Sequence, residues 1–415
     1  MTLKSFFKTR LLLGLACGAV GCTGSMDAQT DGSRSQEGMQ STKAGTRQVH
    51  VMNLSTLGGT VSSGNGINDL GIVTGSSNLA GDTASHAVLW FFGLRLDLHT
   101  LGGQSSNVPW PVKNVRGVIS GISETTEPRP LGELWSCARG GFFASDSGNV
   151  CRGFIWEHGV MSTLPTFGGP NGFATGINNH DQAVGWAENT VHDPTCTAPQ
   201  VFQFKAAVWD AGSRVIHELP TLPGDSVGAA TAINDLGQIV GITGACGTAV
   251  GSVSARHAVM WHDGQVTDLG NLGGIAWNTP MSVNQRGDVV GFANVPRADG
   301  TVTTAFNAHG FIYTPESGMQ EIKPLGDDVY SQALGINDQR QVVGLSCTAG
   351  FASCRAIFWE NGVATDLNEV VTPGYRDHLY TANDINDLGL ITGQTVRADS
   401  GDTVAFVAIP VGSGP

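Results

Sequence analysis

The sequence is poor in charged residues and contains few of the motifs of common enzyme classes. Only 14% of its 415 residues are charged, the formal net charge is −13 and there is no basic run, which argues against nucleic-acid binding. The patterns H-E-x-x-H and G-x-x-x-x-G-K-[ST] are missing, so neither signature indicates a reaction, and the spacing G-x-S-x-G occurs once, as "GDSVG" from Gly224 to Gly228. Close Cys-x-x-Cys pairs are missing too, and we expect no metal and no cofactor.

Long hydrophobic runs are also lacking. The apolar run "LLLGLACGAV" near the N-terminus is too short to span a bilayer and follows three basic residues, so we interpret residues 1–21 as a cleaved signal peptide. The string "AVGC" resembles a bacterial lipobox, although Ala19 stands where Leu is usual. This resemblance implies that Cys22 is lipidated and becomes the first mature residue. Plain signal-peptidase cleavage is the alternative.

Residues 22–46 contain no aromatic or β-branched aliphatic residue to bury, and we expect a disordered tether after the lipidated Cys22. The predicted location is the bacterial cell envelope, lipid-anchored at the outer membrane, or the extracellular medium. We expect a monomer that meets a membrane only through its N-terminal lipid.

Glycine is abundant, with 58 residues, and one short string recurs. "GINDLGIVTG" begins at Gly66, and "INDLGQIVG" and "INDLGLITG" begin at Ile233 and Ile385. A pattern with fewer fixed positions occurs seven times, and in each copy an Asn is followed seven residues later by a Gly. The Asn residues are Asn68, Asn114, Asn178, Asn234, Asn284, Asn337 and Asn386. We interpret each copy as a hairpin whose Asn-Asp pair serves turn chemistry and not metal binding, with Asp181 and Arg340 replacing the turn glycine in two copies.

A second apolar string, such as "HAVLW", follows each hairpin and predicts a buried third strand. A turn and a strand ending in "DL" complete a four-stranded meander. The last copy lacks its fourth strand, whereas the chain near Val49 resembles a fourth strand with nothing before it. We therefore predict a seven-bladed β-propeller of residues 47–415, closed by the N-terminal strand. The expected repeats are 58–98, 99–164, 165–219, 220–269, 270–322, 323–367 and 368–409, with the closing strand at 47–57.

The strings "HAVLW", "TDLGNLGG" and "INDLGQIVG" resemble the HAF repeats of bacterial extracellular proteins. The likeness covers about Val49 to Pro415. It implies export and a repeated architecture, and it implies no particular reaction. The long second copy and the missing aromatic residue at Ala408 depart from the pattern.

The loop between the second and third strands is the variable part of each repeat, and it shares one face of a propeller with the bridges between blades. We expect a noncatalytic protein that binds a glycan or protein ligand there, mainly through the long loop of the second repeat. Aromatic residues outside the repeated positions, together with one basic residue, are the candidate ligand contacts. They are Trp110, Trp135, Phe142, Phe143, Trp186, Trp277, Tyr330 and Arg152.

Two further residue sets leave alternatives open. Basic residues begin six third strands and either pair with local acids and carbonyls or recognise an anion; they are His86, Arg152, Lys205, His257, His309 and Arg355. Loop acids could instead support a polysaccharide lyase or glycoside hydrolase, which is the alternative function. They are Glu124, Glu127, Glu133, Glu188, Asp193, Asp327 and Asp328.

Six cysteines follow the tether, and an even number in an exported chain predicts disulfides, with fifteen possible pairings. The expected pairs are Cys347 with Cys354, Cys137 with Cys151, and Cys196 with Cys246.

Overall fold

The computed structural model describes residues 48–133, 142–247 and 251–411. These residues form 28 β-strands, so the predicted all-β class is confirmed. The helices among them are three short 3₁₀ turns, η1 (Ser252–Ala255), η2 (Ala349–Phe351) and η3 (Leu367–Glu369), and in the described part no helix has the length and apolarity needed to span a membrane. The predicted signal peptide, tether and Cys22 lie outside the described residues.

Five sheets contain four strands each, and every one is an antiparallel meander in chain order. Their strands are β6 (Ser106–Asn107), β7 (Ile119–Pro128), β8 (Asn149–Glu157), β9 (Val160–Thr163); β10 (Gly172–Ile177), β11 (Gln182–His192), β12 (Phe202–Asp210), β13 (Ile216–Glu218); β14 (Val227–Ile233), β15 (Ile239–Gly244), β16 (His257–His262), β17 (Gln265–Asp268); β18 (Thr279–Val283), β19 (Val289–Asn294), β20 (Ala308–Thr314), β21 (Gly318–Ile322); and β22 (Tyr330–Ile336), β23 (Val342–Cys347), β24 (Cys354–Glu360), β25 (Val363–Asp366).

The remaining eight strands form one sheet from the two ends of the chain. They are β1 (Val49–Asn53), β2 (Gly58–Ile67), β3 (Val73–Leu79), β4 (Ser85–Phe91), β5 (Leu94–Asp97), β26 (His378–Ile385), β27 (Ile391–Val396) and β28 (Thr403–Pro410). Strand β1 pairs antiparallel with β28, from Val49 opposite Pro410 to Asn53 opposite Phe406. The two halves of this sheet meet through one parallel pair, Val61 with Thr403.

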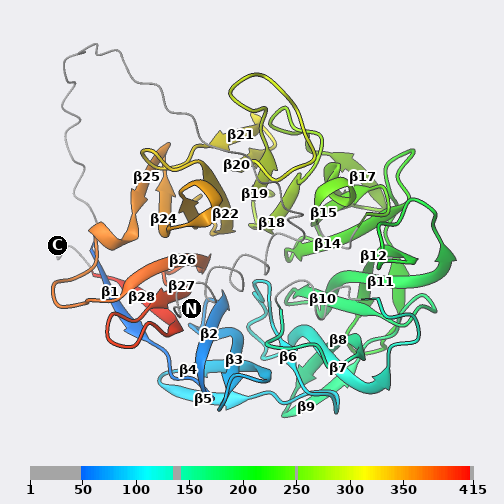
Figure 1. The fold of residues 1–415 in the computed structure, drawn as a ribbon, viewed down its shortest axis with the longest axis horizontal. Helices are drawn as coiled ribbons and strands as arrows, with labels where there is room; N and C mark the ends of the chain where they lie inside the picture. Colours follow the sequence, from blue (N-terminus) through cyan, green and yellow to red (C-terminus); the bar gives the residue numbers. More distant parts are fainter. Residues whose placement is uncertain (1–47, 134–141, 248–250, 412–415) are drawn as a thin grey trace, which may run out of the picture.

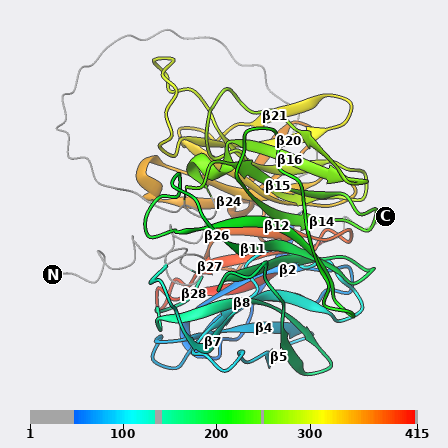
Figure 2. The same ribbon diagram turned by 90° about the vertical axis from the view of Figure 1, so that its right-hand side faces the viewer.

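The sheets are arranged around a common centre in a propeller-like ring (Figure 1). The first strand of each repeat, such as β2, β10 or β14, lies nearest the centre, and the fourth, such as β5 or β9, lies at the rim. Strands such as β8 and β12 run across the short dimension of the ring (Figure 2). Because the strands alternate in direction, the loops between second and third strands and the bridges between repeats share one face, which we call the loop face.

The second repeat departs from the regular pattern. Its innermost strand, β6, has only two residues, and the chain from Val108 to Val118 continues without a strand. Pro109 and Pro111 lie in this segment and have no amide hydrogen to donate to a neighbouring strand. This repeat is still the four-stranded meander that the sequence predicts, with its first strand shortened to two residues.

The hairpin turns have the backbone conformation that the repeated string predicts. The turn glycine is left-handed in five copies, for example Gly237 at φ 75°, and Asp181 and Arg340 adopt φ 60° and 61°. An arginine in this region costs about 1 kcal/mol. The Arg340 guanidinium contacts the buried Asp288 carboxylate at 2.8 Å and 2.9 Å, which offsets this cost.

The second repeated glycine is required by close packing. A Cβ atom built on it would lie 1.8 to 2.4 Å from a carbonyl oxygen of the first strand in all seven copies, for example 2.1 Å from Ala229 O at Gly241. No other amino acid fits this contact without moving the backbone.

The repeated Asn has a role beyond the turn. In each copy its Oδ1 accepts hydrogen bonds from the backbone N–H groups two and four residues later. Its Nδ2 also donates to the backbone carbonyl of the same Asn in the next repeat, at 2.7 to 3.1 Å. These bonds run from Asn68 to Asn114, Asn178, Asn234, Asn284, Asn337 and Asn386 in turn, and from Asn386 back to Asn68. The Asn side chain therefore has two roles: its Oδ1 caps its own turn, and its Nδ2 links its repeat to the next one.

The repeated Trp anchors the bridge that leads into its own repeat. Trp90, Trp209 and Trp261 are buried, and their Nε1 atoms donate to the carbonyls of Ser55, Pro165 and Pro220. The corresponding residues of the other copies that carry an aromatic ring are partly exposed; they are Trp156, Tyr313 and Trp359.

Candidate functional site

Most of the aromatic residues predicted to contact a ligand are buried. Trp110, Trp186 and Trp277 are at most 3% exposed, and Phe143 is 8% exposed. Together with Phe173 and Phe204 they belong to a hydrophobic cluster of the second to sixth repeats. This cluster also contains Cys151, Cys246, Cys347 and Cys354. The expectation of exposed rings is therefore wrong for these four. They fill space between the strand ends and the loops that cover them.

The long loop of the second repeat is held down at its described ends. Ring contacts join Trp110 to Phe142 and Trp186, and the Asn107 side chain donates to the Phe142 carbonyl at 2.7 Å. Glu133 Oε1 accepts from two backbone N–H groups of the next repeat, those of Val201 and Phe202. The described ends of this loop are thus part of the packed structure, and Trp135 lies outside the described residues.

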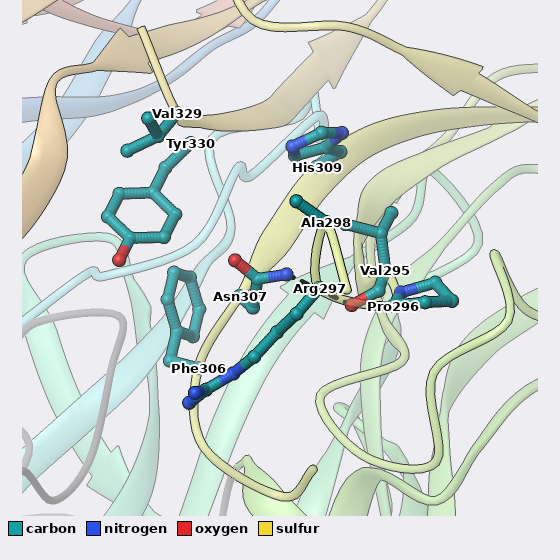
Figure 3. A pocket seen from close by; sticks show the side chains of 9 residues that line it. All are labelled: Val295, Pro296, Arg297, Ala298, Phe306, Asn307, His309, Val329 and Tyr330. Carbon is teal, nitrogen blue, oxygen red and sulfur yellow. Dashed lines mark hydrogen bonds between the residues drawn. The ribbon is translucent and has the colours of Figure 1, made fainter. Parts of the chain in front are cut away.

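A pocket of about 540 Å³ opens on the loop face between the fifth and sixth repeats (Figure 3). The loop from β19 to β20 and the start of β22 line it. Its residues are Val295, Pro296, Arg297, Ala298, Phe306, Asn307, His309, Val329 and Tyr330. Of the predicted contacts with described side chains, Tyr330 is the one that reaches this pocket.

Aromatic rings form one side of the pocket. Figure 3 shows Tyr330 and Phe306 on that side and Val295, Pro296 and Ala298 opposite. The Tyr330 ring stacks on Phe351 with centroids 4.8 Å apart, and the Phe306 centroid lies 5.8 Å from that of Tyr330. Phe306 in turn packs edge-on against the buried Trp277. Rings held in this way present a firm apolar surface at small entropic cost.

Polar groups complete the pocket. Arg297 is exposed, and within the described residues its guanidinium has no carboxylate within salt-bridge distance. The Asn307 amide donates to Val295 O at 3.0 Å. His309 Nδ1 contacts Glu321 Oε1. The pocket therefore offers a fixed aromatic surface beside one exposed guanidinium, whose charge also interacts with the Asp299 carboxylate.

Several of the loop acids suggested for catalysis are buried and engaged in the fold. Glu124 accepts from the backbone N–H groups of Gln104 and Ser105, and Glu188 accepts from Asn171 N and Nδ2 and from Gln200 Nε2. Burial, and then the nearby Glu133, raise the pKa of Glu188 to about 8. These carboxylates hold the bridge and loop segments above their own strands.

The other acids of this set are scattered. Burial alone would raise the pKa of Asp193, but hydrogen bonds from Thr195, Ser226 and Gln203 together outweigh it and lower the pKa to about 2. Asp328 is buried and pairs with Arg355 at 3.1 Å. Glu127 and Asp327 are exposed.

The basic residues that begin the third strands have local partners. His86, His257 and His309 contact carboxylates of Asp97, Asp225 and Glu321, and Lys205 and Arg355 also approach acids. Arg152 donates to Thr166 Oγ1 at 3.0 Å and to Gly169 O at 3.3 Å, and burial lowers its pKa. This geometry matches the pairing alternative for the ring of basic residues.

Two predicted disulfides are confirmed. Cys347 pairs with Cys354 and Cys196 with Cys246, the second linking the third and fourth repeats. Cys151 is also disulfide-bonded, and Cys137, its predicted partner, lies outside the described residues. Disulfides are typical of proteins exported to an oxidising compartment.

Sequence reasoning missed Phe306, Phe351 and Arg297. The two phenylalanines lie outside the repeated positions, so the signal that selected Tyr330 was present for both. No comparable indication existed in the sequence for Arg297, because its position beside the aromatic rings depends on how the loop from β19 to β20 folds.

No protein-family model matches the sequence, and no curated protein sequence matches it. Solved structures share its fold. A puromycin-hydrolyzing peptidase of Mycobacterium tuberculosis is similar with a TM-score of 0.50 and 10% identity, over 90% of this chain and 56% of the peptidase. Pyrococcus horikoshii acylaminoacyl peptidase is similar with a TM-score of 0.46 and 11% identity, over 81% of this chain and 49% of that one. The chain thus spans about half the length of these peptidases, and the likeness concerns the propeller-like fold alone.

Proposed function

We propose that the protein is a noncatalytic binding protein of the cell envelope, a seven-bladed propeller whose loop face binds a glycan or protein ligand. The pocket between the fifth and sixth repeats is its main contact. The observation that carries the proposal is the exposed Arg297 beside the fixed rings of Tyr330 and Phe306.

Two observations support closure of the ring by the N-terminal strand. The seven Asn side chains donate from repeat to repeat and return to the first, and β1 pairs along its whole length with β28. A third contact spans the junction, because Lys113 of the second repeat contacts Asp384 of the seventh at 2.7 Å, and Asp384 also accepts from Ile67 N of the first.

The chemistry of the pocket favours a ligand with a flat apolar face and a negative charge. Sugar rings and peptide side chains both stack on aromatic residues, and a guanidinium binds carboxylates in a fork geometry. An acidic polysaccharide unit satisfies both requirements at once. The buried state of Glu124, Glu133 and Glu188 favours binding over the lyase or hydrolase alternative, because these acids serve as hydrogen-bond acceptors for loop backbone.

The sequence supports the location. A signal peptide ending at residue 21 and lipidation at Cys22 would anchor the protein at the outer membrane through the tether of residues 22–46. Mass measurement of the mature N-terminus from a native host would test this point.

The binding proposal is tested by screening the mature protein on an array of neutral and acidic glycans and envelope proteins. Arg297→Ala is expected to weaken binding of acidic probes at least about tenfold, because it removes a charge-assisted hydrogen bond. Tyr330→Ala is expected to weaken binding similarly, and Tyr330→Phe, which keeps the ring, much less.

Arg95→Ala is the matched control, since Arg95 is exposed on the rim strand β5 and lies far from the pocket in the chain order of repeats. Binding that survives unchanged in both Arg297→Ala and Tyr330→Ala would refute the pocket as the binding site. Release of new reducing ends or unsaturated sugars during incubation with the array polysaccharides would refute the noncatalytic role.

A further inference from the structure

A cluster of two imidazoles and a carboxylate lies in the first repeat, apart from the pocket. His86 is the second residue of β4, Asp97 ends β5, and His99 follows in the bridge to the second repeat. One ligand atom from each of the three residues lies within 4.8 Å of the other two.

The Asp97 carboxylate lies between the two rings. Its Oδ2 is 2.9 Å from His86 Nδ1 and 3.6 Å from His99 Nδ1. Around a tetrahedral zinc ion with bond lengths near 2.0 to 2.1 Å, neighbouring ligand atoms are about 3.3 Å apart. The two observed distances lie on either side of that value, so small side-chain rotations would bring the three atoms to ligand spacing.

Comparison with the other repeats shows what is special about the first. The fifth repeat has the same kind of histidine–acid pair, His309 with Glu321, and Lys323 stands where His99 stands in the first. At the same position, directly after the residue that closes the fourth strand, the other repeats up to the sixth have Pro165, Pro220, Gly270 and Asn368. Pairing of a third-strand histidine with an acid is thus a feature of the fold, whereas the second imidazole is not.

The backbone holds His99 in place for this role. Its φ is 62°, in the left-handed region, where the fourth repeat has Gly270 at φ 85°. Its N–H donates to Asp97 Oδ1 at 2.8 Å, and its carbonyl accepts from Ser106 Oγ. His99 is 77% exposed at its side chain, while His86 and Asp97 are 16% and 24% exposed, so a bound ion would keep one side open to solvent.

We propose that His86, Asp97 and His99 form a binding site for a divalent transition metal ion, with zinc as the best match. Two imidazole nitrogens and one carboxylate oxygen suit zinc, and three protein ligands leave a fourth position for water or for an anionic group. The expectation of no metal relied on cysteine spacing, and a cluster built from two strands and a bridge has no such linear signature.

The test measures zinc binding to the tag-free mature protein after removal of metal with a chelator, by calorimetry and by competition with a coloured zinc indicator. One zinc ion per chain is expected. His99→Asn is the informative variant, because Asn tolerates the left-handed backbone and stands at this position in the sixth repeat. It is expected to weaken zinc binding at least tenfold.

His257→Asn is the matched control, since it removes a histidine from the pair with Asp225 in the fourth repeat, which has Gly270 in place of the second imidazole, and its zinc affinity should equal that of the unmodified protein. Cobalt titration gives a second readout, because the absorption of a bound cobalt ion reports its coordination and should change in His99→Asn. Failure of the unmodified protein to bind one zinc ion, or equal zinc affinity in His99→Asn, would overturn the proposal.

Discussion

Replacement of one ring Asn should reveal how strongly the repeats are tied together at the centre. The Asn234 side chain is buried, its Oδ1 accepts from Leu236 N at 3.1 Å and Gln238 N at 2.9 Å, and its Nδ2 donates to Asn284 O at 2.8 Å. Asn234→Ala leaves these three backbone groups without their partner. At about 1 kcal/mol for each, we expect the free energy of unfolding to fall by about 3 kcal/mol.

Two further variants separate the turn from the link between repeats. At low pH the protonated carboxyl of Asn234→Asp keeps an acceptor for the turn and has one donor where the Asn234 amide has two, which bond Asn284 O and Gln238 Oε1. At low pH it should therefore be less stable than the unmodified protein and more stable than Asn234→Ala. Asp235→Ala is the control. The Asp235 carboxylate accepts from Asn179 N and Nδ2 at 2.8 Å, but the side chain is only half-buried, and the second repeat has Val115 at this position, which accepts nothing. We expect Asp235→Ala to lower the free energy of unfolding by at most about 1 kcal/mol.

Urea unfolding of the disulfide-intact protein, followed by tryptophan fluorescence, measures these differences at pH 7 for the two alanine variants and at low pH for the comparison of Asn234→Asp with Asn234→Ala. A cost below 1 kcal/mol for Asn234→Ala, or an equal cost for Asp235→Ala, would refute the view that the inner ring of hydrogen bonds stabilises the fold.

The other predictions concern pH and the disulfides. The pKa of Glu188 is raised from its ordinary value of 4.5 to about 8. Between these two pH values the folded protein therefore keeps a proton that the unfolded chain releases. The contribution of Glu188 to the free energy of unfolding is complete below pH 4.5 and is lost as the pH rises to about 8. Glu188→Gln should therefore remove up to about 5 kcal/mol of the decline in unfolding free energy between pH 4.5 and 8.5, and an unchanged pH profile would contradict this account. Removing the Cys196–Cys246 disulfide, which closes a separation of 50 residues, should cost about 4 kcal/mol, and removing Cys347–Cys354, with a separation of 7, about 2.5 kcal/mol by the loop-entropy estimate. Urea unfolding of the two double-serine variants measures both, and the reverse order would contradict the estimate.

The repeat pattern predicted the sheets well because its signals are local. The left-handed φ at Gly237 and the absent Cβ at Gly241 follow from the spacing within one hairpin, and each copy repeats the evidence. The link from Asn234 to the carbonyl of Asn284 could not be predicted from the hairpin alone, since it depends on the approach of a neighbouring repeat.

The functional surface was harder to predict, because its residues become adjacent only after the loops fold. Trp186 and Trp277 are of a residue type that is common in ligand-binding surfaces, but both are buried in the hydrophobic cluster. The pocket exists because the loop that contains Arg297 lies beside the first residues of β22, which begin 33 positions later in the chain. The cluster of His86, Asp97 and His99 likewise combines two strands and a bridge, so spacing along the sequence does not reveal it.

These contacts also determine which experiments are informative. The long loop of the second repeat carries Phe143 into the hydrophobic cluster and brings Glu133 to the backbone of the third repeat. Deleting that loop would expose apolar surface and break two hydrogen bonds to Glu133, so lost binding in such a deletion would not distinguish a contact from a folding defect. Arg297 lacks an ion-pair partner among the described residues and is exposed, so its substitution changes the charge of the pocket with little change in packing. A loss of binding in Arg297→Ala with unchanged unfolding free energy is therefore the result that assigns recognition to the pocket.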